Sequence, residues 1–131
     1  MIVTAFYAGL LALLFLLLSV RVVLRRQDGA SLGDGGDQRL LRVIRGQANF
    51  AEYVPFILLM MALLELGHTS RYLIHGLGIA LLVSRLLHGY ALSFTDHFKF
   101  GRFWGAGLTF TVLAVCAVLC MWQGLRGFSL T

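Results

Sequence analysis

The sequence has few charged residues, and this shortage separates it from ordinary soluble proteins. Only 13% of the 131 residues are charged, and 59% are hydrophobic, whereas a soluble domain carries about 25% charged residues. A water-soluble fold of this composition would expose large apolar patches, and such patches promote aggregation. The composition therefore predicts an integral membrane protein made of one compact unit.

Basic residues are missing ahead of the first apolar run. A cleaved signal peptide needs positive charge before a short apolar region and small residues at the cleavage site. Here no Lys or Arg precedes the run, and Arg21, Arg25 and Arg26 follow it, so we expect a retained helix. The run also lacks an acidic residue. This argues against a four-helix multidrug exporter, because such proteins depend on an acidic residue in the first helix.

Proline and cysteine are scarce, and the few that occur suggest no covalent or metal chemistry. Pro55 is the only proline, and Cys116 and Cys120 are the only cysteines. The two cysteines lie four residues apart on one expected helix, which does not favour a disulfide between them. They are interpreted as small apolar residues. No pair of histidines has the i, i+4 spacing of a helical zinc site, so no metal site is predicted.

Four apolar segments are long enough to cross a bilayer, which takes about 20 helical residues. They predict an all-α fold, a bundle of four transmembrane helices at about residues 2–24, 40–66, 71–94 and 102–123, forming one domain over residues 1–131. The first and fourth segments are almost purely apolar. The second and third contain charged residues, which makes them candidates for a functional site.

Lysine and arginine are distributed unevenly among the expected connections. Six arginines surround the first connection and Lys99 and Arg102 lie at the third, whereas the second has only Arg71. Because Lys and Arg stay on the cytoplasmic side, we expect connections one and three in the cytoplasm and both termini in the periplasm. These charges serve as topology anchors, so the net charge of +5 requires no nucleic-acid partner.

The stretch "RVIRGQANFAEYVP", residues 42–55, places several polar groups at the start of the second apolar segment. On a helix, the side chains of Arg42, Arg45, Asn49, Glu52 and Tyr53 fall within an arc of about 100°. Charged groups at membrane depth cost at least about 2.5 to 3.5 kcal/mol each, so they face the bundle interior and find partners there. We therefore expect this face to point inward.

The third segment has a matching polar face. Ser84, Arg85 and His88 also fall within about 100° of one another, so the two polar faces have reason to meet. One interpretation is a structural lock in which Glu52 neutralises an arginine. The other is a site for an anionic ligand, because three arginines on these faces exceed one glutamate and forked guanidinium donors suit carboxylates.

The quoted stretch resembles the second-helix signature of the MAPEG family, the membrane-associated proteins of eicosanoid and glutathione metabolism. That signature reads Arg-x-x-Arg-x-Gln-x-Asn-x-x-Glu-Tyr-x-Pro. "SRLLHGYAL", residues 84–92, is similar to the third-helix pattern of the family, and the resemblance extends over the whole chain. It is nearest to small bacterial members. The resemblance implies a homotrimer in the bacterial inner membrane, surrounded by lipids, with glutathione bound between neighbouring subunits near the cytoplasmic side.

The resemblance also implies roles for individual residues. Residues expected to bind glutathione are Arg25, Arg45, Gln47, Asn49, Glu52, Tyr53, Arg85 and Tyr90. The carboxylates of the tripeptide suit Arg45 and Arg85, and its ammonium suits Glu52. Arg102 is the expected catalytic residue that stabilises the thiolate, with Lys99, Arg25 and Arg26 as alternatives. His88 is either a packed, hydrogen-bonded histidine or a catalytic one.

Taken with the resemblance, these residues suggest a membrane-bound glutathione-dependent transferase or peroxidase that acts on lipophilic electrophiles or hydroperoxides. The alternative is a non-enzymatic membrane protein that binds glutathione or an anionic lipid as a structural or sensing ligand. Glutathione binding and conjugation assays distinguish the two.

Overall fold

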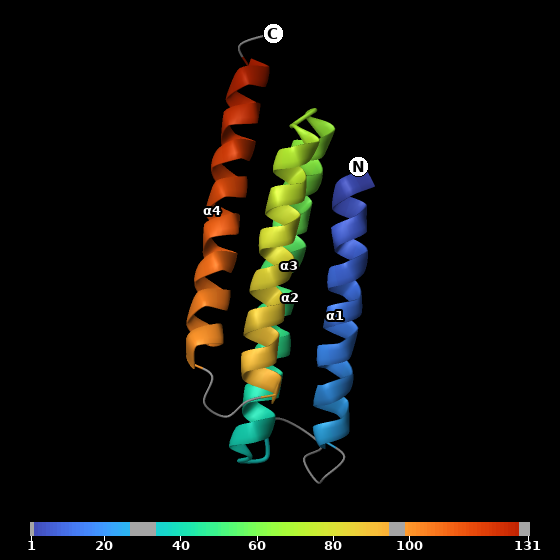
Figure 1. Ribbon diagram of the computed structural model, residues 1–131, viewed down its shortest axis with the longest axis vertical. Coiled ribbons are helices and arrows are strands. Elements are labelled where there is room, and N and C mark those ends of the chain that lie inside the picture. Colours follow the sequence, from blue (N-terminus) through green and yellow to red (C-terminus); the bar gives the residue numbers. More distant parts are fainter. Residues whose placement is uncertain (1, 27–33, 95–98, 129–131) are drawn as a thin grey trace.

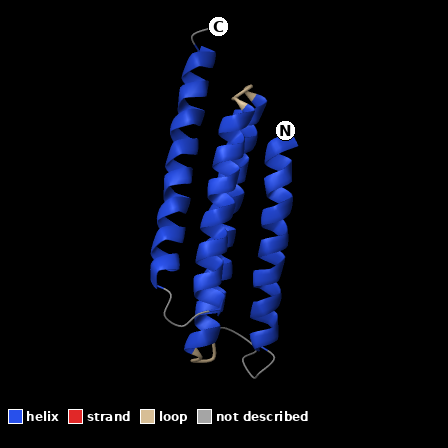
Figure 2. Ribbon diagram, viewed as in Figure 1, coloured by secondary structure: helices blue, strands red, loops and turns tan. Residues whose placement is uncertain are grey.

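The computed structural model describes residues 2–26, 34–94 and 99–128, and these form four helices (Figure 1). They are α1 (Ile2–Arg26), α2 (Gln38–Leu66), α3 (Arg71–Phe94) and α4 (Lys99–Phe128). The described parts of the chain contain helices and short turns and no strand (Figure 2). All four helices are long and apolar enough to span a membrane. The predicted all-α bundle of four spans is confirmed, and α4 extends beyond the expected 102–123 at both ends.

The helices run alternately up and down, so the start of α1 and the end of α4 lie at one end of the bundle (Figure 1). We call this the terminus end, and the opposite end, where α1 and α3 end and α2 and α4 begin, the connection end. α2 and α3 each contact the other three helices, whereas α1 and α4 do not contact each other within the described residues. The central pair is therefore α2 and α3, the two helices that carry the polar faces.

Each end of α2 is closed by a recognisable cap. At its start the Asp37 side chain accepts a hydrogen bond of 2.8 Å from the Arg39 backbone N–H, which satisfies a donor that the first turn leaves free. At its end the Thr69 N–H donates to the Leu64 carbonyl at 3.1 Å, and His68 adopts a left-handed φ of 60°. This Schellman-type arrangement usually has glycine in the left-handed position.

Two glycines let neighbouring helices approach closely. A Cβ on Gly78 of α3 would collide with the ring of Tyr7 on α1, and a Cβ on Gly105 of α4 would lie 2.8 Å from the backbone nitrogen of His88. Close approach of backbones is the main way in which helices associate in lipid. At Gly105 this approach brings α4 directly against the polar face of α3.

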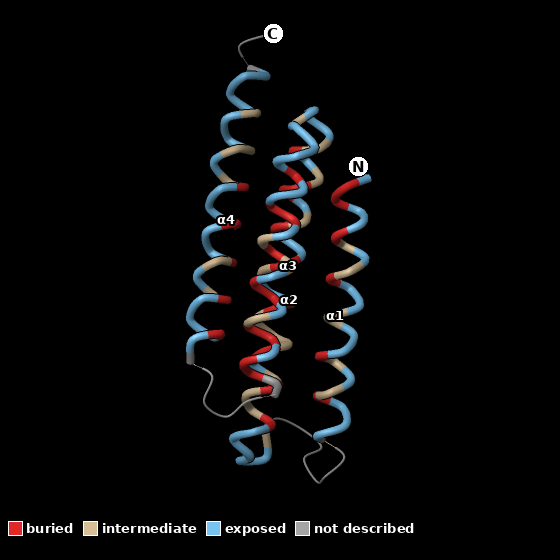
Figure 3. Tube along the Cα trace, in the orientation of Figure 1, coloured by how far each residue is buried: buried red, intermediate tan, exposed pale blue. Residues whose placement is uncertain are grey.

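Buried residues follow the inward side of each helix and exposed residues the outward side (Figure 3). The exposed residues are largely apolar, including Phe103, Trp104 and Trp122. In water such a surface would be a liability. In a bilayer it is the surface that lipid tails cover.

Candidate functional site

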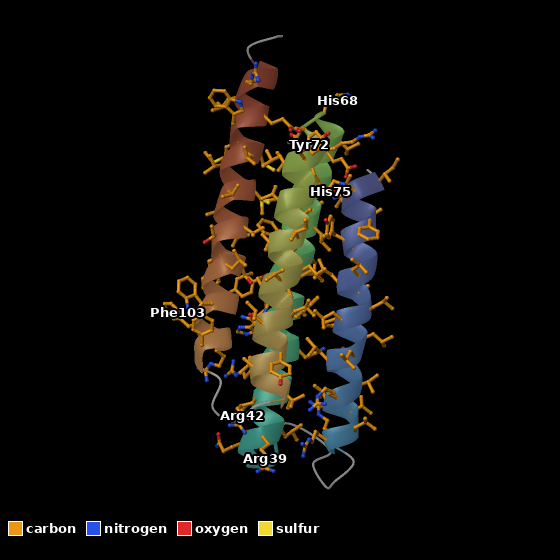
Figure 4. All side chains as sticks on the ribbon, in the orientation of Figure 1. Arg39, Arg42, His68, Tyr72, His75 and Phe103 are labelled. Atoms are coloured by element: carbon orange, nitrogen blue, oxygen red, sulfur yellow. The ribbon has the colours of Figure 1, made fainter. Side chains whose placement is uncertain are left out.

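The polar face of α2 lines a pocket of about 340 Å³ at the connection end. Its lining residues are Leu41, Arg42, Arg45, Ala48, Asn49, Glu52, His88, Leu92 and Arg102. Figure 4 shows Arg42 near this end, far from His68 and His75 at the terminus end. Four of the five residues expected on one face share the pocket. The fifth, Tyr53, instead packs edge-on against Phe110, with ring centroids 5.3 Å apart.

The opposite wall comes from α3 and α4. His88 of α3 is 7% exposed and hydrogen-bonds the backbone of Arg102. Its Nδ1 atom is buried and has no hydrogen-bond partner within the described residues. The contact with Arg102 anchors the start of α4 beside α3, and the Arg102 side chain then reaches the pocket that α2 lines. His88 is thus packed and hydrogen-bonded, and it also lines the pocket.

A buried arginine lies behind the pocket rather than in its lining. Arg85 is 1% exposed, and its Nη2 donates to Oδ1 of Asn49 at 2.9 Å. Its Nη1 donates to the Thr109 hydroxyl at 3.3 Å, and its guanidinium lies 5.7 Å from the centre of the Phe50 ring. Among the described residues no carboxylate pairs with Arg85. The expected meeting of the α2 and α3 polar faces is confirmed, but Glu52 does not neutralise Arg85.

The pocket lining has more positive than negative groups. Three arginines, Arg42, Arg45 and Arg102, stand against one carboxylate, Glu52. A site of this composition favours an anion, and arginine forks bind carboxylates with two parallel hydrogen bonds. The single carboxylate can receive a ligand's ammonium group. The lining therefore suits a small molecule with several carboxylates and one amine.

The remaining predicted residues lie outside the pocket of this subunit. Gln47 is half-buried, and Arg25, near the end of α1, is exposed. Tyr90 is 55% exposed on α3. The side chain of Lys99, an alternative to Arg102, is outside the described part of the structure. The structure thus brings together Arg45, Asn49, Glu52 and Arg102, and it places Arg25, Gln47, Tyr53 and Tyr90 elsewhere.

Sequence reasoning did not assign Arg42 to the site, although it recognised its face. Arg42 lines the pocket with Ala48 and Leu92. The available signal was helical spacing, because Arg42 precedes Arg45 and Asn49 by three and seven residues on the same stripe. In the described residues, no group of three or more His, Cys, Asp or Glu side chains could hold a metal ion.

The chain has four membrane-length helices and a cationic pocket between the second helix and the two that follow. These features define a class of membrane protein, and comparison with known proteins identifies that class. Residues 4–122 match the MAPEG family, and the chain belongs to this family. The resemblance found in the second helix is therefore confirmed. The inner membrane protein YecN of Escherichia coli strain K12 is 37% identical over 120 residues, which cover 91% of this chain and 86% of YecN. A protein of the same name from Escherichia coli O6:H1 matches to the same extent.

Proposed function

We propose that this protein is a membrane-bound glutathione-dependent transferase or peroxidase acting on lipophilic electrophiles or hydroperoxides. The observation that carries the proposal is the shared pocket, in which Arg45, Asn49 and Glu52 of α2 face Arg102 of α4. Its volume of about 340 Å³ is within the range of small-molecule sites. Membership of the MAPEG family supports glutathione as the ligand.

The chemistry of glutathione fits the lining group by group. Its two carboxylates suit Arg42 and Arg45, and its ammonium suits Glu52. Asn49 offers a neutral hydrogen-bonding group between the charged ones. This division leaves Arg102, on the opposite wall, for the thiol end of the tripeptide.

Arg102 is the proposed catalytic residue, because a thiol reacts as its thiolate and a nearby cation stabilises that anion. In a transferase reaction the thiolate sulfur attacks the electrophilic carbon and forms a carbon–sulfur bond, while a leaving group departs from that carbon or a C=C π bond opens and takes up a proton. In a peroxidase reaction it attacks a hydroperoxide oxygen, the O–O bond breaks, and the alcohol leaves with a proton. A second glutathione thiol then attacks the resulting sulfenic acid, which forms the disulfide and releases water. The same bound thiolate serves both reactions.

We also propose that the protein is a homotrimer whose sites lie between subunits. Arg45 and Glu52 are exposed in the single chain, although α2 is a membrane-length helix. Charged groups in contact with lipid tails are costly, and a neighbouring copy that covers them removes this cost. Tyr90, Gln47 and Arg25 lie outside the pocket of their own subunit and would contact glutathione from the adjacent one. Sedimentation of the purified protein tests the trimer.

The proposed location is the bacterial inner membrane, with both termini in the periplasm. The relative YecN is named as an inner membrane protein, and the connection end carries most of the arginines. Trp104 and Trp122 of α4 are both exposed and about 27 Å apart along the helix, close to the thickness of the hydrocarbon core. Arg102 would then lie at the cytoplasmic interface.

Two measurements test the proposed function. Calorimetry of detergent-purified protein with glutathione tests binding, and a conjugation assay with a generic aromatic electrophile tests turnover. Binding with conjugation supports the proposal, whereas binding without conjugation or peroxidase activity favours the non-enzymatic alternative. If glutathione does not bind but anionic phospholipid does, the pocket is a lipid site.

A further inference from the structure

The orientation of the Asn49 side chain is fixed by its neighbour on α3. Nη2 of Arg85 lies 2.9 Å from the Asn49 amide. A guanidinium has only donors, so the amide atom that faces it must be the oxygen. The assignment of Oδ1 to this contact therefore follows from chemistry. The Asn49 oxygen is turned toward Arg85, which occupies one of its two lone pairs, and the NH₂ group is directed away from that contact.

The NH₂ group of Asn49 has no hydrogen-bond partner among the described residues, and Asn49 lines the pocket. A polar group removed from water costs free energy unless it finds a partner. Because the oxygen is turned toward Arg85, the NH₂ group at the other end of the amide is the one offered to the pocket. A ligand atom bound there must be an acceptor, such as a carboxylate or peptide carbonyl oxygen.

Arg85 is itself held away from the pocket. Its second hydrogen bond goes to Thr109 of α4, whose hydroxyl also donates to the Gly105 carbonyl at 2.8 Å. Phe50 lies beside the guanidinium. These contacts on α2 and α4 fix the guanidinium in place, so it cannot swing out to the ligand without breaking them.

The burial of Arg85 would be costly if this residue had only a structural role. Arg85 is buried without a carboxylate, and its Nε has no hydrogen-bond partner within the described residues. Apolar side chains of similar volume often replace a buried charge without loss of stability. A buried arginine at this cost is therefore better explained by an effect on the pocket than by packing.

We propose that Arg85 is a positioning residue that acts through Asn49. It holds the Asn49 oxygen and thereby directs the NH₂ group to an acceptor oxygen of the pocket ligand, so that Asn49 contacts the ligand as a hydrogen-bond donor. The inference rests on the proposed function for the identity of the ligand, glutathione. It revises the expected role of Arg85, which was direct contact with a glutathione carboxylate.

The test uses the fact that Asn49 is the only asparagine in the chain. Protein made by cell-free synthesis with ¹⁵N-labelled asparagine gives one pair of side-chain amide signals. The two amide protons are resolved whether or not the side chain is fixed, because rotation about the amide C–N bond is slow. In the ligand-free wild type we expect their chemical shifts to differ from those of a free asparagine amide. Arg85→Met should broaden or shift the two signals. The control is Ser84→Ala, which removes a hydroxyl from the same buried network, where Ser84 lies 3.1 Å from Thr109, and should leave them unchanged.

Glutathione titration tests the ligand half of the inference. Binding should shift the Asn49 NH₂ signals in the wild type, and Arg85→Met should weaken the affinity about tenfold, as expected for one lost charge-assisted hydrogen bond. Asn49→Ala should weaken it similarly, and the double variant should be no weaker than the weaker single variant. Additive losses would contradict a role for Arg85 through Asn49.

The remaining outcomes also decide between the proposals. If glutathione binds without moving the Asn49 signals, the inference is wrong and the proposed function stands. If glutathione does not bind the wild type, the proposed function and the ligand half fail together, and the ligand-free spectra still decide the Arg85 contact. If Arg85→Met does not fold, Arg85→Lys replaces it. The shorter ammonium should shift the Asn49 signals, and unchanged signals overturn the inference.

Discussion

The two ends of the bundle both carry polar groups, but they use them differently. At the terminus end, Glu65 of α2 accepts hydrogen bonds from the Val3 and Thr4 backbone N–H groups at 3.0 and 2.9 Å. There the hydroxyl of Tyr7 also lies 3.1 Å from Nδ1 of His75. At the connection end, the Asn49 donor and three arginines face a pocket instead.

This difference separates a structural polar cluster from a candidate binding site. Glu65 satisfies donors that the first turn of α1 leaves free, so it acts as a cap supplied by another helix. The terminus end also borders a larger pocket, lined by His68, Arg71 and His75 among others. Its polar groups, however, bond mainly to one another and to the backbone. The connection end instead lines its pocket with three arginines and one carboxylate.

Arg45→Ala is expected to have the largest effect on glutathione binding. If binding were unchanged, the distinction between a binding site at the connection end and a structural cluster at the terminus end would be wrong. Glutathione binding should weaken by about 2 to 5 kcal/mol, because the variant removes one partner of a charge pair that a neighbouring subunit is proposed to bury. Calorimetry measures the loss. Arg39→Ala is the matched control, since Arg39 is exposed on the same helix and outside the pocket lining. If much of the Arg45→Ala protein unfolds but the fraction that stays folded binds glutathione normally, the structural lock is favoured.

Arg102→Leu should affect reactivity more than binding. A free thiol titrates near about 8.5, and each unit by which Arg102 lowers this pKa corresponds to about 1.4 kcal/mol. We expect the thiolate absorbance of bound glutathione at neutral pH to disappear. Conjugation should slow by at most about tenfold for each such unit, because a thiolate of higher pKa is intrinsically more nucleophilic. Affinity should change little, because Arg45 and Glu52 hold the rest of the tripeptide. Lys99→Leu and Arg25→Leu serve as comparisons, and loss of the thiolate signal in either would move the role to that residue.

Glu65→Ala tests the structural reading of the terminus end. The variant leaves two N–H groups of α1 without their carboxylate, and loss of a helix cap costs about 1 to 2 kcal/mol. Thermal unfolding in detergent should report this destabilisation, whereas glutathione affinity of the folded protein should be unchanged. Arg71→Ala changes a charge at the same end but leaves the hydrogen bonds from Val3 and Thr4 to Glu65 in place, so it should alter neither the unfolding temperature nor the glutathione affinity. A selective loss of glutathione binding in Glu65→Ala would mean that the two ends are coupled.

His68→Gly should have the smallest effect, and it should raise the stability of the protein rather than lower it. The left-handed φ of His68 costs a residue with a side chain about 1 kcal/mol relative to glycine. The variant should therefore be slightly more stable in thermal unfolding and should bind glutathione normally. Destabilisation would show that the His68 imidazole contributes a contact at the terminus end that offsets the strained backbone.

Much of the fold and part of the site could be predicted because the membrane restricts both. Only helices satisfy every backbone group of a single segment in hydrocarbon, so apolar runs predicted the number and type of elements. Helical spacing placed Arg45, Asn49 and Glu52 on one face, and all three line the pocket. The same spacing failed for Tyr53, which lies at the edge of the arc and turns toward Phe110.

The sequence by itself determined four membrane-length helices, one polar stripe on α2, the family, and the excess of arginine. Only the tertiary structure decided that Arg85 lies behind Asn49, that Arg102 faces α2 across the pocket, and that Glu65 caps α1. Periodicity gives the angular position of a side chain on its own helix. It does not give the rotation and axial offset of the neighbouring helix, which close contacts such as that of Gly105 with His88 set. Whether a charged side chain enters a pocket or supports it from behind depends on those two quantities.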